Sequence, residues 1–171
     1  MTESRDGGGP ASGEKLEVER KFLLDQRPRW LGDHPSVHIR QGYVAIVLGE
    51  VEVRVRETDD GAVLTVKRGE GEVRREEEIE LADDQFRALW PLTEGARLEK
   101  RRYSVPHEGG TVEVDVYEGP LDGLAVAEVE FDSDRDSAEF EPPEWFGREL
   151  TGNTRYANES LATDGAPKVD R

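Results

Sequence analysis

The 171-residue chain contains no cysteine, which excludes disulfide bonds and thiolate metal sites. It also lacks any apolar run near the roughly 18–20 residues that span a membrane, and its start has no apolar segment typical of a secretory signal. Its three histidines, His34, His38 and His107, are not clustered as in a zinc site. These absences predict a cytoplasmic protein with no membrane partner.

Basic residues are few: 23 Lys and Arg stand against 39 Asp and Glu, a net charge of −16. This balance argues against general nucleic-acid binding, because the phosphate backbone would be repelled. An anionic ligand therefore needs a local basic site. Apolar residues make up only 35% of the chain, but the charges alternate with Val, Leu, Ile and Tyr, which is typical of half-buried strands. The length fits one folded domain.

Eight segments show strand-like alternation, and turn signals such as Asp59-Asp60-Gly61 and Gly109-Gly110 separate several of them. Short strands in close succession favour antiparallel pairing. The predicted strands are Leu16–Leu24, Ser36–Val47, Val51–Glu57, Ala62–Lys67, Arg74–Leu81, Leu98–Val105, Thr111–Tyr117 and Leu124–Phe131. Helices are predicted from Asp83 or Asp84 to about Leu92, from Ser133 to before Pro142, and over Asn153–Ala162. Residues 1–15 are expected to form a flexible leader, 16–162 the domain, and 163–171 a flexible tail.

The charges on one face of each predicted strand are sorted by sign. Because residues i and i+2 share a face, Arg54 and Arg56 form a basic pair, and Glu113 and Asp115 an acidic one. Two interpretations are open: the charged faces are the solvated outside of a β-sandwich, or they line an interior. A solvated face more often mixes signs, because like charges opposite each other destabilise a sheet. Bases suit phosphoryl oxygens and carboxylates suit hard divalent cations, so the sorting favours a site for a metal-bound polyphosphate.

Seven short motifs occur here in the order of a known family. They are E-x-E-x-K at Glu17-Val18-Glu19-Arg20-Lys21, followed by VRVR, LTVK, EEEI, EKRRY, VEVDVY and AEVEF. From about Leu16 to Ala162 the chain resembles the triphosphate tunnel metalloenzymes, also called the CYTH superfamily. HIRQGY (38–43) and TGNTRYANESLA (151–162) look like the short bacterial branch. The resemblance implies a mainly β (α+β) fold: a closed eight-stranded antiparallel barrel, with a charged tunnel inside and helices packed outside.

The resemblance also implies roles for the charged residues. Phosphate oxygens would be bound by Lys21, Arg40, Arg54, Arg56, Lys67, Lys100, Arg102 and Arg155. Two Mg²⁺ or Mn²⁺ ions would be held by Glu17, Glu19, Glu113, Asp115, Glu128 and Glu130. Glu19, Lys67, Glu76 and Glu78 are expected to act in catalysis, Glu76 and Glu78 by orienting bases or helping to deprotonate water. The implied reaction is hydrolysis of inorganic tripolyphosphate to pyrophosphate and phosphate.

Several alternatives stay open at this point. Other substrates known in the family are thiamine triphosphate, nucleoside triphosphates and, for class IV adenylate cyclases, ATP. A cyclase needs an adenine pocket, which the sequence does not identify, and WFG at 145–147 looks most like the inorganic triphosphatases. A non-catalytic polyphosphate-binding module would tolerate loss of the acidic pairs, all of which are present. The expected partner is a small polyphosphate, and the protein would be a monomer or a homodimer.

Overall fold

Eight antiparallel strands form a single sheet in the computed structural model, which describes residues 18–70, 73–107 and 110–168. The strands are β1 (Val18–Leu23), β2 (Ser36–Val47), β3 (Val51–Thr58), β4 (Gly61–Glu70), β5 (Val73–Leu81), β6 (Arg97–His107), β7 (Gly110–Glu118) and β8 (Ala125–Phe131). Their order across the sheet is β1-β8-β7-β6-β2-β3-β4-β5. The eight predicted strands and the mainly β class are therefore confirmed.

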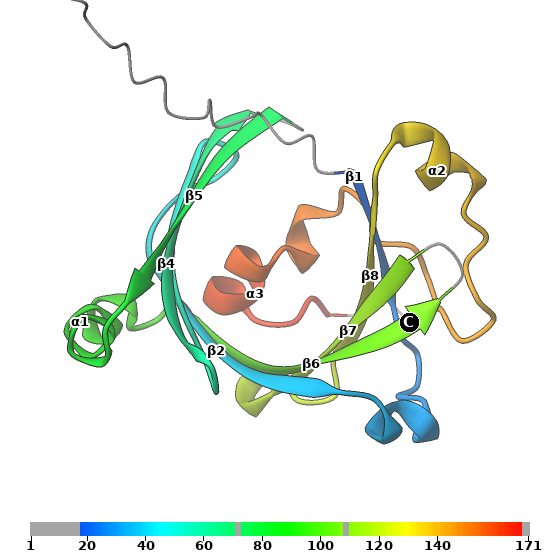
Figure 1. Ribbon diagram of the computed structural model, residues 1–171, viewed down its shortest axis with the longest axis horizontal. Helices are drawn as coiled ribbons and strands as arrows, with labels where there is room; N and C mark the ends of the chain where they lie inside the picture. Colours follow the sequence, from blue (N-terminus) through cyan, green and yellow to red (C-terminus); the bar gives the residue numbers. More distant parts are fainter. Residues whose placement is uncertain (1–17, 71–72, 108–109, 169–171) are drawn as a thin grey trace, which may run out of the picture.

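The sheet curves strongly, so that its concave side surrounds α3 (Asn158–Asp164) in Figure 1. Within the described ranges, hydrogen-bonded pairing ends at β1 and β5, and the sheet is open between these two edges. The predicted closed barrel is wrong, because closure requires the two edge strands to pair. Helix α3 stands on the concave side between the two halves: its Glu159 borders one cavity with Lys67 of β4 and another with Lys21 of β1.

Two of the helices cover the convex side of the sheet. Helix α1 (Asp83–Leu89), continued by η2 (Trp90–Thr93), packs on β3, β4 and β5, and α2 (Asp134–Glu139) packs on β1 and β8 (Figure 1). Three further 3₁₀ turns are η1 (Arg29–Asp33), η3 (Gly119–Leu121) and η4 (Thr154–Tyr156), the last of which precedes α3. The prediction that the helices lie outside is thus wrong for α3, which contacts β2 and β6 from the concave side. No helix in the described part of the chain is long and apolar enough to cross a membrane.

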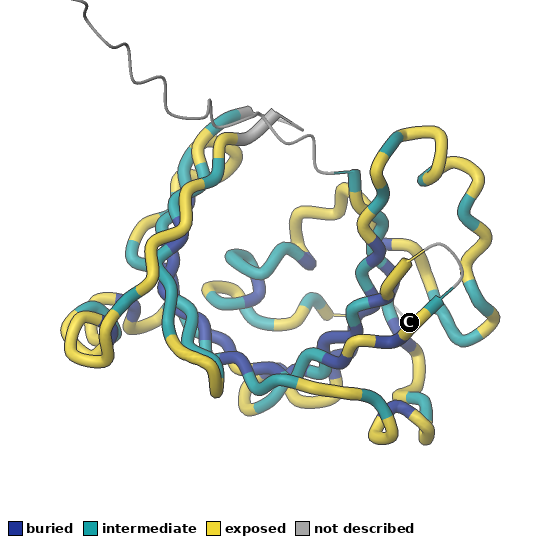
Figure 2. Tube along the Cα trace, in the orientation of Figure 1, coloured by how far each residue is buried: buried dark blue, intermediate teal, exposed yellow. Residues whose placement is uncertain are grey.

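Apolar side chains form two separate cores. One lies on the convex side of β1, β6, β7 and β8, where Phe22 and Val114 pack beneath Phe140, Trp145 and Phe146. The other fills one end of the concave side and consists of Leu98, Tyr117, Leu121, Leu124, Val126, Leu150, Tyr156 and Leu161. Figure 2 shows buried segments along the floor of the curved sheet and exposed ones near its open edges. Charged residues occupy much of the remaining concave surface.

Strand β2 approaches Thr93 of η2 closely at Gly42. A Cβ atom at this position would lie 2.5 Å from the Thr93 Oγ1 atom, far inside van der Waals contact. The pairing of β2 with β3 is irregular between Tyr43 and Ala45, immediately after this contact. Glycine therefore lets β2 bend tightly around the turn that follows α1.

Arg20 ties β1 to the segment that follows β8. Its Nε and Nη2 atoms donate to the Glu149 carboxylate at 2.8 and 2.9 Å, and Nη1 donates to the carbonyls of Ser137 and Phe140 at 3.1 Å. We expect Arg20→Ala to lower the free energy of unfolding by about 1–3 kcal/mol, because two charge-assisted bonds and two carbonyl bonds are lost. Urea denaturation measures this change.

The matched control is Arg135→Ala. Arg135 is also paired with a glutamate, at 2.8 Å, but its side chain is 81% exposed. Its replacement should change the free energy of unfolding by no more than about 0.5 kcal/mol. Equal effects of the two substitutions would show that Arg20 does not anchor this segment.

Candidate active site

The strand register places the predicted charged residues on the concave face. Arg102 lies opposite Asp115 across β6 and β7, and Lys67 lies opposite Glu76 across β4 and β5. Residues at alternate positions share this face. The concave charged face consists of Glu19, Lys21, Glu52, Arg54, Arg56, Lys67, Glu76, Glu78, Lys100, Arg102, Glu113, Asp115, Glu128 and Glu130. Glu17 lies outside the described residues.

Asp115 is the centre of a buried ion-pair network. Lys100 Nζ donates to its Oδ2 atom at 2.5 Å, and Arg102 donates to Oδ1 and Oδ2 at 2.7 and 2.8 Å. The side chains of Lys100 and Asp115 have no exposed surface. Arg102 also bonds Glu128 at 3.0 Å and forms an ion pair with Glu113. Burial favours a neutral Asp115, but attraction from Lys100 and Arg102 outweighs burial and lowers the pKa of this carboxyl.

Two bases of this face, Lys100 and Arg56, are held where their charge is costly, whereas neighbouring carboxylates raise the pKa of Lys21 and Arg102. Burial lowers the pKa of Lys100 to about 8, despite attraction from Asp115. Burial and repulsion from Arg54 and Arg102 lower the pKa of Arg56 to about 10. Such shifts are typical of functional sites, since an arriving anion would stabilise the charged forms.

A second network joins β3, β4 and β5. Arg54 Nη1 donates to Glu52 at 3.1 Å, its Nη2 lies 3.8 Å from Glu76, and Lys67 Nζ lies 2.7 Å from Glu76. Arg54 is only 8% exposed, and its Nε atom is buried with no hydrogen-bond partner among the described residues. A buried donor without an acceptor requires an explanation, and a bound anion would supply one. Sequence reasoning missed Glu52, although it stands two positions before Arg54 and so shares its face.

Carboxylates gather at one end of the concave charged face. Glu19, Glu113, Glu128 and Glu130, four of the predicted metal ligands, line a cavity of about 410 Å³. Burial raises the pKa of Glu113, whereas attraction from Lys21 and other bases outweighs burial and lowers that of Glu128. An all-carboxylate donor set fits hard cations such as Mg²⁺ or Mn²⁺. The residues present therefore fit the metal that the sequence predicts.

Arg40 lies on the other side of the sheet. Its Nη1 atom donates to Glu57 at 2.7 Å, and its guanidinium group stacks on the Trp90 ring at 4.6 Å. Its neighbours Ile39 and Gln41 face the concave side, because Ile39 pairs with Lys100 and Gln41 bonds Arg56. The structure therefore does not bring Arg40 together with the other predicted phosphate ligands.

Two other predicted residues lie at the margin of the site. Arg155 is exposed on η4, and the structure does not bring it into the ion-pair networks of the concave charged face. Glu78 is exposed on the edge strand β5, where its Oε1 atom accepts a 3.1 Å hydrogen bond from Thr65. The buried Tyr156 contributes its carbonyl, which lies 3.5 Å from Lys21 Nζ.

Neutral side chains missed by sequence reasoning complete the site. Asn158 of α3 accepts hydrogen bonds from Lys100 Nζ at 3.3 Å and from the Tyr117 hydroxyl at 2.7 Å. Gln41 accepts from Arg56 Nε at 3.0 Å and donates to the Tyr43 hydroxyl at 2.6 Å. No periodic signal marks Asn158, because its role depends on where α3 packs. Gln41 could have been found from its place on the same face as Ile39.

Known proteins similar to this chain identify its family. The CYTH domain matches residues 15–165. An inorganic triphosphatase of Nitrosomonas europaea is 43% identical over 148 residues, covering 85% of this chain and 96% of the relative. One of Acetivibrio thermocellus is 37% identical over 147 residues, covering 85% and 92%. The chain belongs to the CYTH family.

Solved structures agree with this assignment. The crystal structure of the inorganic triphosphatase NE1496 superposes with a TM-score of 0.68 at 40% identity, covering 86% of this chain and 94% of that one. A putative adenylate cyclase from Bacillus halodurans has a TM-score of 0.51 at 16% identity and covers 72% and 84%. The second likeness shows a shared fold only.

Proposed function

We propose that this chain is a metal-dependent triphosphatase that hydrolyses inorganic tripolyphosphate to pyrophosphate and phosphate. The observation that carries the proposal is the pairing of buried bases with a carboxylate-lined cavity on one concave face. The two inorganic triphosphatases that cover most of this chain support the same reaction. A site with both charge types suits a metal-bound polyphosphate better than either ligand alone.

The bases of the concave charged face would bind the phosphate oxygens. Arginine suits bidentate contacts with phosphate, and lysine supplies a point charge. Arg54 is the clearest candidate, because its buried Nε atom would gain an acceptor. The proposed phosphate ligands are Lys21, Arg54, Arg56, Lys67, Lys100 and Arg102.

The acidic cavity would hold two Mg²⁺ or Mn²⁺ ions through Glu19, Glu113, Glu128 and Glu130. When bound, such ions neutralise the phosphate oxygens and activate water for in-line attack. Asp115 has a different role in this proposal, since both of its oxygens already accept bonds from Lys100 and Arg102. It would hold these two bases in position.

Glu52 and Glu76 would position the bases on the opposite side of the face. Glu52 bonds one end of the Arg54 guanidinium group, and Glu76 lies within 4 Å of both Arg54 and Lys67. Holding a long side chain in one geometry reduces the entropy lost when substrate binds. At the edge of the site, Glu78 would hold the Thr65 side chain in position by accepting its hydrogen bond.

A phosphate-release panel tests the proposal. The full chain is assayed with tripolyphosphate, pyrophosphate, ATP and thiamine triphosphate, each with Mg²⁺ and with Mn²⁺. We expect the highest kcat/KM with tripolyphosphate, loss of turnover after chelation with EDTA, and recovery when the ion is restored.

Three outcomes would contradict the proposal. Cyclic AMP formation from ATP would indicate a cyclase, and turnover unaffected by EDTA would exclude metal dependence. Tight tripolyphosphate binding without phosphate release, in the presence of either ion, would identify a non-catalytic binding module.

A further inference from the structure

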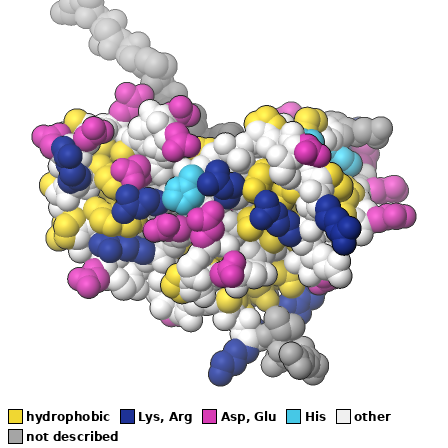
Figure 3. Space-filling model, turned by 90° about the horizontal axis from the view of Figure 1, so that it is seen from below, with side chains coloured by type: hydrophobic (Ala, Val, Ile, Leu, Met, Phe, Trp, Pro, Cys, Tyr) yellow, Lys and Arg dark blue, Asp and Glu magenta, His cyan; other side chains and the backbone are white. Residues whose placement is uncertain are grey.

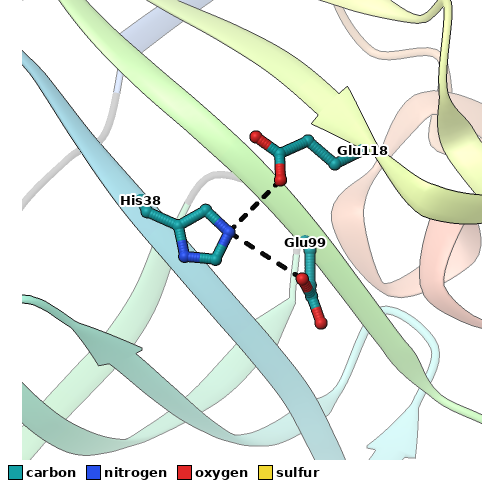
Figure 4. Close-up of side chains that lie close together, drawn as sticks. All are labelled: His38, Glu99 and Glu118. Carbon is teal, nitrogen blue, oxygen red and sulfur yellow. Dashed lines mark ion pairs between the residues drawn. The ribbon is translucent and has the colours of Figure 1, made fainter.

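A histidine and two glutamates meet on the convex side of the sheet, away from the concave charged face. His38 extends from β2, Glu99 from β6 and Glu118 from β7, and their ligating atoms all lie within 4.8 Å of one another (Figure 4). Leu98 and Lys100, the chain neighbours of Glu99, face the concave side. Figure 3 shows this surface with acidic and basic side chains intermixed around a histidine. The proposed function uses none of the three residues.

Two of the three distances between the ligating atoms are close to those of a tetrahedral metal site. Bonds of 2.0–2.2 Å to zinc place neighbouring ligand atoms about 3.3–3.6 Å apart. His38 Nε2 lies 3.3 Å from Glu118 Oε2 and 3.8 Å from Glu99 Oε2. The Glu99 and Glu118 oxygens lie within 4.8 Å of each other, and the Glu99 side chain is 49% exposed, so it has room to move toward the other two ligands.

The strand register supplies a second observation. Glu99 and Glu118 are direct Cα partners across β6 and β7. Like charges directly opposite each other destabilise an antiparallel pair. A cation between the two carboxylates would remove this repulsion, and the His38 imidazole faces the same point.

An arginine flanks each of the two carboxylates. The second oxygen of Glu99 lies 3.9 Å from Arg40 Nε, and that of Glu118 lies 3.9 Å from Arg101 Nε. Each carboxylate thus has one oxygen toward an arginine and the other toward His38. Glu57 pairs with Arg40 at 2.7 Å, so three carboxylates face two guanidinium groups and the patch has one net negative charge.

We propose that His38, Glu99 and Glu118 form a second metal site, selective for a borderline transition-metal ion such as Zn²⁺. One imidazole nitrogen with two carboxylate oxygens suits Zn²⁺ better than Mg²⁺ or Ca²⁺, which prefer oxygen ligands alone. Water would complete the coordination, since all three side chains are partly exposed. The bound ion would join β2, β6 and β7 on the convex side.

Calorimetric Zn²⁺ titration of the tag-free full chain tests the proposal. Excess Mg²⁺ is present throughout, to occupy the carboxylates of the concave charged face. We expect the wild type to bind one more equivalent of Zn²⁺ than His38→Gln, and Glu99→Gln and Glu118→Gln to lose the same equivalent. His107→Gln is the matched control, because His107 packs on Phe140 away from the triad, and it should retain the equivalent.

Two further measurements complete the test. Co²⁺ should give the visible d–d absorption of a four-coordinate site in the wild type but not in His38→Gln. Tripolyphosphate turnover of His38→Gln with Mg²⁺ should equal that of the wild type, which separates this proposal from the proposed function. Equal Zn²⁺ stoichiometry in the wild type and His38→Gln would overturn the proposal and leave an ordinary polar contact between His38 and the two glutamates. Loss of the equivalent in Glu130→Gln instead would place the Zn²⁺ on the concave face and also overturn it.

Discussion

Replacing Arg54 by alanine is expected to lower kcat/KM for tripolyphosphate by about 10²–10³-fold, the usual effect of removing one preorganised donor from a charged transition state. Arg54 is buried, and Glu52 and Glu76 flank its guanidinium group. Its Nε atom has no hydrogen-bond acceptor among the described residues. Arg54→Lys should recover only part of the loss, because lysine offers no bidentate contact. Steady-state phosphate release with Mg²⁺ measures both variants.

The matched control is Arg40→Ala, which removes the same side chain from the opposite side of the sheet. Arg40 pairs with Glu57 and stacks on Trp90, so its loss should change kcat/KM by no more than about threefold. Circular dichroism confirms that both variants are folded. If Arg40→Ala lowered kcat/KM as much as Arg54→Ala, the active site would not be confined to the concave side of the sheet.

Asp115→Ala should lower the free energy of unfolding by about 3–5 kcal/mol, because it leaves the buried Lys100 without its carboxylate. Urea denaturation at neutral pH measures the loss. Glu113→Ala is the control on the same strand: its side chain is 39% exposed and also pairs with Arg102, so its removal should change stability by about 1 kcal/mol or less. Equal losses would show that burial adds nothing to the Asp115 network.

The same network predicts the direction of the pH dependence. The pKa of Asp115 is lower in the folded protein than its ordinary value, so its contribution to stability is fully present above the unfolded pKa of about 3.9. That contribution is lost as the pH falls below this value. Acid should therefore destabilise the wild type more steeply than Asp115→Ala.

The strands and the side that each charged residue faces were largely predictable. In β3, Val53 and Val55 alternate with Arg54 and Arg56, and a period of two assigns the faces without knowledge of the neighbouring strands. The same reasoning placed Lys100 and Arg102 of β6 on the concave side. The sorting of charge by sign was a valid signal, because the sorted residues face the concave side of the sheet.

Other features depend on contacts that alternation does not encode. In β2 the polar residues His38 and Arg40 point outward while Ile39 and Gln41 point inward, the reverse of the pattern elsewhere, and only the pairing with β3 and β6 reveals this. Closure of the barrel was predicted from the family resemblance, but sheet curvature and the position of α3 are long-range properties. Which base pairs with which acid is decided by side-chain conformations across several strands.

The ion pairs of the concave face have a consequence for how its ligands bind. Arg102 is bound to Glu113 and Glu128, and Lys21 lies 2.8 Å from Glu128. In the proposed function, a divalent cation that takes these carboxylates would release the bases toward phosphate, and a phosphate that takes the bases would release the carboxylates toward the cation. The two ligands would therefore free binding groups for each other, and thermodynamic reciprocity would require each to raise the affinity of the other by the same factor.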